Sequence, residues 1–289
     1  MTRVLIVNPF ASGVSERRLA AVQAALPAGT ETVLTQARGD ATELAAEWSP
    51  RPEAIYVFSG DGTYNEVING IRADIPVGFV PGGGTSVLPR ALGLPRDPAR
   101  AAERIASGRP RRISLGRING RRFAFNAGIG FDAELVRRVD GLGRRPDGKR
   151  PGDIAFAWSV VRTLSEHRLH FEPALEVEGL GRAAFVLVAN CSPYTYAGRL
   201  GLRIVPGASF EGGLALVAPV EVRARSIPRL AVQAIRGRPG AAGVLAGHDL
   251  DRIVIHCDIP QPLQVDGEDL GDADEVEIVA ERDALTVLT

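Results

Sequence analysis

The sequence predicts an α/β N-terminal domain with a parallel sheet, followed by a C-terminal antiparallel β-rich domain. In the first 110 residues, short apolar runs alternate with helical patterns, which is typical of parallel strands joined by crossover helices. From Leu169 onward, short strand patterns dominate. A length of 289 residues with 45% apolar residues is enough for two hydrophobic cores. We therefore expect domains over 1–110 and 111–283, and we leave open whether the last strand, 284–289, rejoins the first domain.

Each strand pattern of the first domain precedes a polar or glycine-containing loop and then a helical pattern. Ser15 is a suitable cap for the first helix, and Asp40 with Glu43 has the spacing of a capping box. This alternation predicts helices on both faces of the sheet. The expected strands are Val4–Val7, Thr32–Thr35, Ala54–Phe58 and Pro76–Val80.

The second domain begins with a hairpin signal. The pair Asn119-Gly120 lies between two strand patterns, and this dipeptide favours a tight hairpin turn. Helices are expected over 132–140, 153–167 and 226–236, with a loop rich in Arg, Gly and Pro over 141–152. The expected strands are Ile113–Arg117, Arg122–Asn126, Ala174–Glu178, Ala183–Ala189, Gly213–Val217, Arg252–Cys257, Leu263–Val265, Glu275–Val279 and Leu285–Leu288.

Charge and hydropathy restrict the partners. Lys+Arg and Asp+Glu both number 34, so no global basic field attracts nucleic acid, and we expect no nucleic-acid partner. Neither a signal segment nor an apolar run of about 20 residues is found. We expect a cytoplasmic protein in peripheral contact with a membrane surface, and we leave a homodimer open. Cys191 and Cys257 are expected to be core thiols.

The segment 59–66 carries the strongest chemical signal. A buried strand ends in Ser-Gly-Asp-Gly-Thr and a helix begins at once, with Thr63 and Glu66 at capping-box spacing. Glycines allow a phosphate to approach the backbone, and a helix N-terminus offers N–H groups and a positive dipole end. Asp61 between two glycines suits the handling of a metal ion or a proton. An ordinary Asp-Gly turn is the alternative.

Two further loops have similar chemistry. The segment 81–86 contains three consecutive glycines between a strand and a helix, and the segment 8–13 follows the first strand. The carboxyl ends of parallel strands meet at one edge of the sheet, where ligands bind. Three such loops at one edge predict an anion site more strongly than any one of them, although a simple connector remains the alternative for each.

The chain contains four motifs in order: Asn8-Pro9 with Ser12-Gly13, Ser59-Gly60-Asp61-Gly62-Thr63, the glycine loop before Arg90-Ala91-Leu92, and Asp266-Gly267-Glu268. Together they resemble the diacylglycerol kinase catalytic family, which includes bacterial lipid kinases, sphingosine kinases and ceramide kinases and is distantly similar to NAD kinases and phosphofructokinases. The resemblance covers nearly the whole chain. It implies a nucleotide-binding domain, a β domain for the acceptor, an active cleft between them, and ATP with Mg²⁺.

The resemblance also implies roles for individual residues. Glu268 matches the proton acceptor, and Asp61 would face the phosphates and the metal ion. The implied reaction transfers the γ-phosphoryl group of ATP to a lipid hydroxyl, with diacylglycerol as the favoured acceptor and phosphatidic acid as the product. Without the resemblance, the favoured interpretation of 266–268 is a tight turn in an acidic stretch. The implied nucleotide-binding residues are Asn8, Thr35, Ser59, Gly60, Asp61, Gly62, Thr63, Asn65, Gly83, Gly84 and Thr85.

The chain departs from the family pattern in two places. Ser86 and Val87 follow Thr85 where many members have an Asn and an Asp nearby. Gly212 stands where many members have an Asp that binds a second magnesium ion, and the adjacent Glu211 is the candidate replacement. These departures keep two alternatives open: a kinase for a sphingoid base, a glycolipid precursor or a dinucleotide, and a weakly catalytic protein that binds nucleotide and lipid.

Two weaker features remain. A basic segment could touch anionic lipid headgroups, or it could be a solvated loop. His167 and His170 are three residues apart but have no third metal ligand nearby in the sequence, so a position at a helix end is expected. The basic segment consists of Arg137, Arg138, Arg144, Arg145, Lys149 and Arg150.

Overall fold

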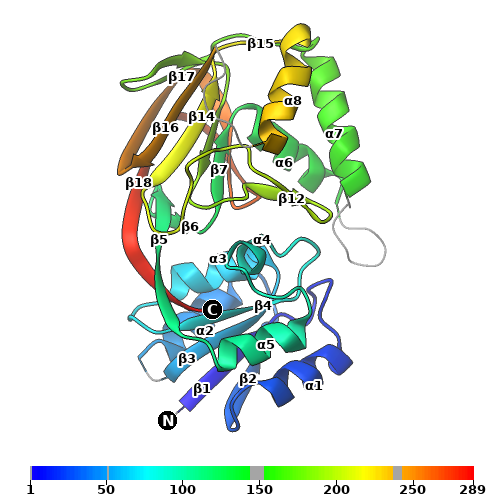
Figure 1. Cartoon of the computed structure of the whole chain (residues 1–289), viewed down its shortest axis with the longest axis vertical. Helices are drawn as coiled ribbons and strands as arrows, with labels where there is room; N and C mark the ends of the chain where they lie inside the picture. Colours follow the sequence, from blue (N-terminus) through cyan, green and yellow to red (C-terminus); the bar gives the residue numbers. More distant parts are fainter. Residues whose placement is uncertain (1, 51, 144–152, 237–242) are drawn as a thin grey trace. The chain divides into compact units, whose positions relative to one another are not determined.

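A computed structural model describes residues 2–50, 52–143, 153–236 and 243–289 (Figure 1). The chain forms two compact units. Unit 1 consists of Met1–Ser114 and Asp283–Thr289, and unit 2 of Leu115–Arg282.

Unit 1 contains a parallel sheet with the strand order β2-β1-β3-β4. The end of β18 (Glu268–Leu288) adds a further parallel pairing, in which Val287 lies opposite Val77 of β4. The elements of this unit are β1 (Thr2–Val7), α1 (Glu16–Ala25), β2 (Thr30–Leu34), α2 (Asp40–Trp48), β3 (Pro52–Ser59), α3 (Asp61–Gly70), β4 (Val77–Pro81), α4 (Val87–Ala91) and α5 (Pro98–Ala106). β5 (Pro110–Ile118) begins in unit 1 and ends in unit 2.

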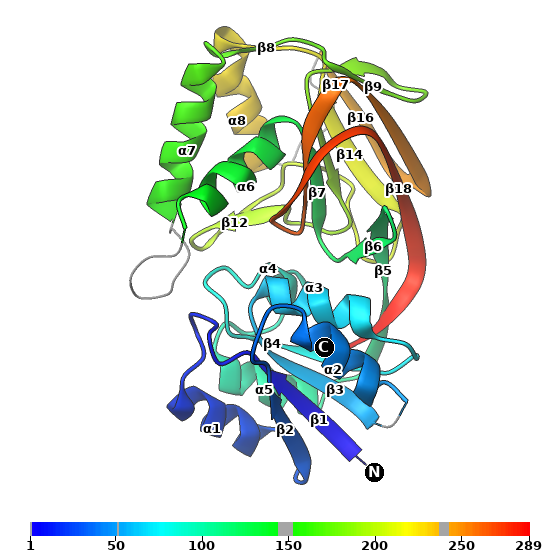
Figure 2. The ribbon, with the colours of Figure 1, turned by 180° about the vertical axis from the view of Figure 1, so that it is seen from behind.

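Helices cover both faces of this sheet. α1 and α5 lie on one face, while α2 and α3 lie on the other (Figure 2). The central strands are therefore enclosed on both sides, which explains why they are continuous apolar runs rather than alternating ones. All four residues of Val4–Val7 have no exposed surface.

Unit 2 contains an antiparallel sheet in the order β16-β14-β11-β7-β17-β18. Its helices are α6 (Phe131–Gly141), α7 (Asp153–Glu166) and α8 (Ile227–Arg236), the last preceded by the short 3₁₀ turn η1 (Ala224–Ser226). The strands are β6 (Arg121–Phe123), β7 (Asn126–Ile129), β8 (His170–Phe171), β9 (Leu175–Val177), β10 (Gly181–Ala183), β11 (Val186–Ala189), β12 (Thr195–Ala197), β13 (Leu200–Leu202), β14 (Leu214–Pro219), β15 (Val222–Arg223), β16 (Val244–Leu250) and β17 (Arg252–Val265), followed by β18.

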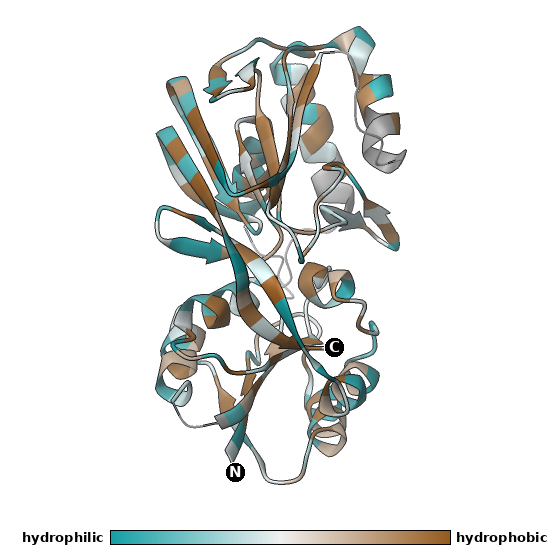
Figure 3. Ribbon diagram, turned by 60° about the vertical axis from the view of Figure 1, so that its left-hand side comes forward, coloured by the Kyte–Doolittle hydropathy of each residue, from teal (hydrophilic) through white to brown (hydrophobic). Residues whose placement is uncertain are grey.

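Side chains alternate between two apolar clusters across this sheet. On β11, Val186 and Val188 belong to one cluster, whereas Leu187 and Ala189 belong to the other. This is the period of two that a strand imposes. On the longer strands of the sheet, Figure 3 shows hydrophobic and hydrophilic bands along the ribbon. The second cluster is covered by all three helices of the unit, through Phe131 of α6, Leu164 of α7 and Leu230 of α8.

The predicted fold class is confirmed, and the differences are local. The hairpin at Asn119-Gly120 forms, with both residues at positive φ. The structure contains the helix α5, which the sequence analysis did not predict, although its Asp97 cap and Pro98 at the first position are favourable start signals. The strands predicted over 252–257 and 263–265 are parts of the single strand β17. Within the described part of the chain, no helix is long and apolar enough to cross a membrane.

Candidate functional site

Three loops of unit 1 meet backbone to backbone at the carboxyl ends of β1, β3 and β4. The N–H of Gly13 donates to the carbonyl of Gly82 at 2.7 Å, and the N–H of Gly82 donates to the carbonyl of Ser59 at 2.6 Å. The loops predicted to meet at one edge of the sheet therefore do so, within a single compact unit.

The glycines in these loops differ in what surrounds them: some pack against another loop, and one faces open space. A Cβ on Gly83 would lie 2.8 Å from the Cα of Gly60, and one on Gly13 would lie 2.7 Å from the carbonyl oxygen of Gly82. Loop packing thus explains these positions, where the sequence suggested contact with an anion. Gly84 differs, because the nearest atom to its Cβ position would be the Ser12 hydroxyl at 3.9 Å. Gly84 leaves open space that a ligand can use.

Asp61 is the first residue of α3, and its carboxylate points at another helix. Its two oxygens accept hydrogen bonds from the backbone N–H groups of Val87 at 3.0 Å and Leu88 at 3.1 Å. These N–H groups belong to the first turn of α4, which has no carbonyl partners for them, so Asp61 supplies their acceptors. Asp61 therefore joins two of the glycine loops.

The capping box predicted at Thr63 and Glu66 is wrong, because α3 begins three residues earlier than that box requires, with Gly60 and not Thr63 as its N-cap. The Thr63 hydroxyl instead accepts hydrogen bonds from the Ser59 hydroxyl at 2.8 Å and the Asn8 side-chain amide at 3.2 Å. Residues from the loops after β1 and β3 are thus linked side chain to side chain.

Two other residues of the predicted set are buried near these strand ends. Thr35 is buried, and its N–H donates to the carbonyl of Val7 at 2.9 Å. Asn65 is buried on α3 and accepts from the side-chain amide of Asn69 at 3.2 Å. Both contribute to the structure of the loop region, and their contact with a nucleotide stays a prediction.

Tyr64 positions the loops, and the sequence analysis gave it no role. Its hydroxyl oxygen lies 2.6 Å from the carbonyl oxygens of both Ser59 and Val80, at the ends of β3 and β4, and its single proton is shared between them. Burial raises the pKa of Tyr64 well above its ordinary value, so the hydroxyl keeps its proton. Its burial could have been anticipated from its place on the inner face of α3.

A basic hollow of about 180 Å³ opens beside the glycine loops. Its composition, glycine backbone with three guanidinium groups, suits phosphate groups, because arginines bind them in a bidentate manner. The arginines escaped the sequence analysis as ligands, although each lies within a short distance along the chain of a glycine loop. The hollow is lined by Gly13, Arg18, Pro81, Gly83, Gly84, Thr85, Ser86, Arg90, Arg96 and Pro98.

In unit 2, the turn at 266–268 connects β17 to β18. Asp266 and Gly267 both have positive φ, and the Asp266 carboxylate accepts three backbone N–H groups of residues 124–126, at 2.8, 3.0 and 3.1 Å. Asp266 thus has a structural role. Glu268 is half-buried, and its carboxylate forms an ion pair with Arg121 on β6.

A polar cluster that the sequence analysis missed lies beside this turn. One carboxylate oxygen of Asp132 accepts from the Tyr194 hydroxyl at 2.7 Å and from the Gln264 amide at 2.6 Å. The side-chain oxygen of Gln264 in turn accepts from the N–H of Gly267 at 2.9 Å. Burial raises the pKa of Asp132, despite these two hydrogen bonds. The cluster fixes the backbone immediately before Glu268.

The predicted metal ligands differ in how well they fit magnesium. Among the described residues, no three His, Cys, Asp or Glu side chains gather as a metal site. Mg²⁺ is often held by one or two carboxylates together with substrate phosphates, so Asp61 beside the basic hollow fits a magnesium ion that arrives with a nucleotide. The Glu211 carboxylate accepts a hydrogen bond from the Ser209 hydroxyl in its own loop, and its role as a magnesium ligand stays a prediction.

The weaker features do not form a site in the described residues. His167 lies 2.8 Å from Glu134, and His170 lies 2.7 Å from Glu221. Arg137 and Arg138 of the basic segment are paired with acidic side chains. Arg144, Arg145, Lys149 and Arg150 lie outside the described residues.

Comparison with known proteins agrees with this geometry. Residues 2–118 match the diacylglycerol kinase catalytic domain. The match ends at the last residue of β5, so it contains all three glycine loops and the basic hollow. It confirms the resemblance that the loop motifs predicted.

Individual relatives point the same way. The chain is 41% identical over 115 residues to a diacylglycerol kinase of Bacillus subtilis, an alignment that spans 38% of this chain and 38% of that relative. A solved diacylglycerol kinase from Bacillus anthracis has a TM-score of 0.73 at 20% identity, with 99% of this chain and 96% of that chain covered. An NAD kinase from Archaeoglobus fulgidus, solved in complex with ATP, has a TM-score of 0.54 at 13% identity, with 99% and 93% covered. These two structures share the fold.

Proposed function

We propose that this chain transfers the γ-phosphoryl group of ATP to a hydroxyl group of a membrane lipid, with diacylglycerol as the favoured acceptor. The observation that carries the proposal is the basic hollow of unit 1. It combines glycine backbone with the guanidinium groups of Arg18, Arg90 and Arg96, inside the stretch that matches the catalytic-domain family. Phosphoryl transfer depends mainly on positioning and on neutralising charge, and this hollow offers both.

In this proposal the triphosphate lies against the loop at Gly83 and Gly84, with the arginines balancing its charge. The bonds of Asp61 to the backbone of α4 hold its carboxylate in one orientation, and a carboxylate oxygen can accept more than one bond. Asp61 would help to hold a magnesium ion that arrives with the nucleotide, and that ion would supply positive charge against the charge that develops on the phosphate oxygens. Asn8 and Thr63 are proposed to contact the remainder of the nucleotide, since their side chains are already ordered by one another.

Glu268 is the proposed proton acceptor for the lipid hydroxyl. Its ion pair with Arg121 limits the orientations of the carboxylate, and the buried bonds of Asp266 fix the turn that carries it. A base must come within hydrogen-bond reach of the proton it accepts, about 3 Å. An immobilised turn suits that requirement better than a flexible one.

Diacylglycerol is favoured as acceptor because relatives bear the name diacylglycerol kinase. The structural similarity to an NAD kinase keeps a dinucleotide as the second candidate. A lipid acceptor requires the protein to work at the membrane surface, in peripheral contact with it.

The proposal is tested by incubating the full chain with γ-labelled ATP, Mg²⁺ and separate acceptors: diacylglycerol, a sphingoid base and a glycolipid in mixed micelles, and NAD in solution. We expect label in phosphatidic acid, and loss of label when the metal is chelated. Label in NAD alone would replace the lipid proposal with the dinucleotide one. Nucleotide binding without label in any acceptor would indicate the weakly catalytic binding protein.

A matched pair of variants tests the hollow itself. Arg96→Gln removes a lining guanidinium group, whereas Arg17→Gln removes an exposed arginine of α1 that does not line the hollow. We expect Arg96→Gln to raise the KM for ATP about tenfold, the scale of one lost charged hydrogen bond, and Arg17→Gln to leave it unchanged. Equal KM values would remove the hollow from the nucleotide site.

A further inference from the structure

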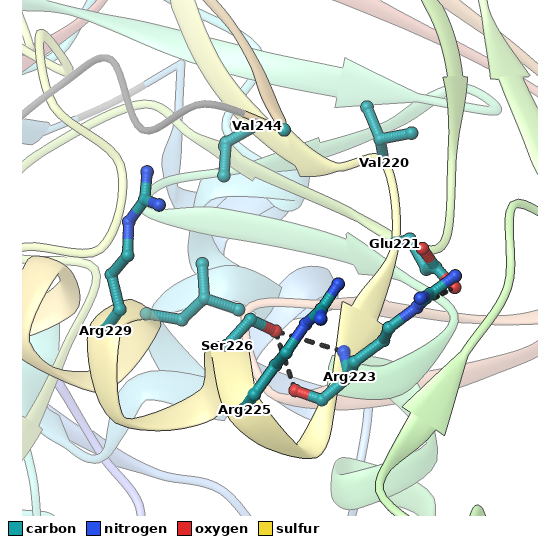
Figure 4. A pocket seen from close by; sticks show the side chains of 9 residues that line it. Val220, Glu221, Arg223, Arg225, Ser226, Arg229 and Val244 are labelled. Atoms are coloured by element: carbon teal, nitrogen blue, oxygen red, sulfur yellow. Dashed lines mark hydrogen bonds and ion pairs between the residues drawn. The ribbon is translucent and has the colours of Figure 1, made fainter.

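Unit 2 contains a second basic hollow, of about 320 Å³, formed where β15 leads through η1 into α8. It is built from residues that have no role in the proposed reaction. Three arginines line it, and Figure 4 shows Arg225 and Arg229 extending from the start of the helix toward the chain segments that carry Val220 and Val244.

The charges in this hollow are incompletely balanced. Arg223 forms an ion pair with Glu221 at 2.6 Å, and Glu221 also contacts His170 at 2.7 Å. Within the described part of the chain, no acidic side chain pairs with Arg225 or Arg229, and both are exposed. Two positive charges therefore remain available. A phosphate monoester carries about −1.5 to −2 at pH 7, which matches them, whereas a phosphodiester carries only a single negative charge.

The walls of the hollow add an apolar component. Val220, Leu230 and Val244 line it together with the arginines. Val232, which is 46% exposed, follows Arg229 by three residues on α8 and so lies on the same side of that helix. Charged groups with adjacent apolar surface suit an amphiphile better than a free inorganic ion.

We propose that this hollow binds the phosphomonoester headgroup of a lipid at the membrane surface. Arg225 and Arg229 bind the phosphate oxygens, and the apolar walls contact the glycerol and the first carbons of the chains. This inference rests on the proposed function in one respect: a lipid phosphomonoester is the class of product that the proposed reaction makes. Its consequence is retention of the protein on membranes where that product has accumulated.

The test is co-sedimentation of the full chain, without ATP, with three kinds of vesicle: phosphatidylcholine alone, phosphatidylcholine with phosphatidic acid, and phosphatidylcholine with enough phosphatidylglycerol to match the surface charge. We expect binding to the phosphatidic acid vesicles to exceed binding to the charge-matched vesicles. Arg225→Gln with Arg229→Gln should reduce binding about thirtyfold, the scale of two basic side chains at an anionic surface. Thermal melting should stay unchanged, because both side chains are exposed.

Two control variants make the outcome specific. Arg109→Gln with Arg203→Gln removes two exposed arginines that do not line the hollow, and it should bind as the unaltered chain does. Arg225→Lys with Arg229→Lys keeps the charge but not the paired donors, and it should lose the preference for phosphatidic acid over phosphatidylglycerol.

Three results would overturn the proposal: equal binding to both anionic vesicles, equal loss in the two Gln pairs, or displacement from vesicles by millimolar inorganic phosphate, which would indicate a site for the free ion. Because this experiment contains no ATP, its failure leaves the kinase proposal standing. Conversely, if the chain has no kinase activity but still prefers phosphatidic acid vesicles, the kinase proposal fails and the proposed lipid-phosphate site stands.

Discussion

The carboxylate of Asp61 accepts a hydrogen bond from the backbone N–H of Val87 at 3.0 Å, across 26 positions of sequence. The residue proposed to handle the metal ion therefore also fixes the start of α4. Val87 stands near the place where many family members have an acidic residue. Here the backbone at that position, and not its side chain, interacts with Asp61.

This double role makes a prediction for Asp61→Asn. The amide keeps one acceptor oxygen, so one of the two N–H groups of α4 loses its partner. We expect the free energy of unfolding to fall by about 1–2 kcal/mol, which lowers the melting temperature by several degrees. Turnover should be abolished at a temperature where the variant is folded. Wild-type turnover in the folded variant would show that Asp61 is only a structural residue.

For Glu268→Gln we expect the catalytic rate to fall about 10²-fold or more, because the amide cannot accept a proton, while the KM for ATP stays near its original value. The ion pair with Arg121 provides the control. Arg121→Gln removes the pair but keeps the base, so it should retain much more activity than Glu268→Gln. If the two variants lose activity equally, Glu268 acts by holding the turn and not as the base.

Gly83→Ala and Gly84→Ala should affect different properties: the first should lower stability, and the second should weaken nucleotide binding. The added methyl group on residue 83 meets the backbone of Gly60 at 2.8 Å, so this variant should be destabilised by about 1–3 kcal/mol. The methyl group on residue 84 meets nothing closer than 3.9 Å, so that variant should keep its melting temperature. Because residue 84 lines the basic hollow, its affinity for ATP, measured by calorimetry, should fall. An unchanged affinity would show that the phosphates do not use this loop.

Asp132→Asn should change the dependence of stability on pH. Burial raises the pKa of Asp132, so the folded state holds this proton more tightly than the unfolded state does, and the ionised side chain costs stability. This cost is absent below the ordinary pKa of Asp and is fully present once the pH exceeds the raised one. The amide can still accept from Tyr194 and Gln264.

We therefore expect Asp132→Asn to melt at a higher temperature than the original chain at pH 8, and at the same temperature near pH 3. If the variant is instead less stable at pH 8, the hydrogen bonds to the ionised carboxylate stabilise the fold by more than the burial of its charge destabilises it.

The sequence was sufficient to predict that the loops after β1, β3 and β4 meet, because parallel strands bring their carboxyl ends to one edge. It could not show that Asp61 binds the backbone of α4, since that contact depends on the packing of two helices. The arginines of the hollow were missed for a similar reason: Arg18 and Arg96 lie 78 positions apart, and only the fold places both beside the same loop.

The length of β17 and β18 also escaped prediction. Pro and Asp residues within 258–262 and 272–274 read as turns in isolation, but the ladder between the two strands continues past them with shifts of register. A long antiparallel pairing can absorb such residues at bulges, where local propensity alone predicts an interruption.

The bonds of Asp266 have a consequence for the order of folding. The hairpin of β17 and β18 is local, but its turn is completed by N–H groups of residues 124–126, which come about 140 positions earlier in the chain. Closing so long a loop is entropically costly, and contacts of this range form late and slowly. An isolated peptide of the two strands would therefore lack the three N–H donors that fix the Asp266 carboxylate. The turn carrying Glu268 becomes fixed only after residues 124–126, at the start of β7, have docked against it, so a chain that is still assembling this unit does not yet have its proposed base in place.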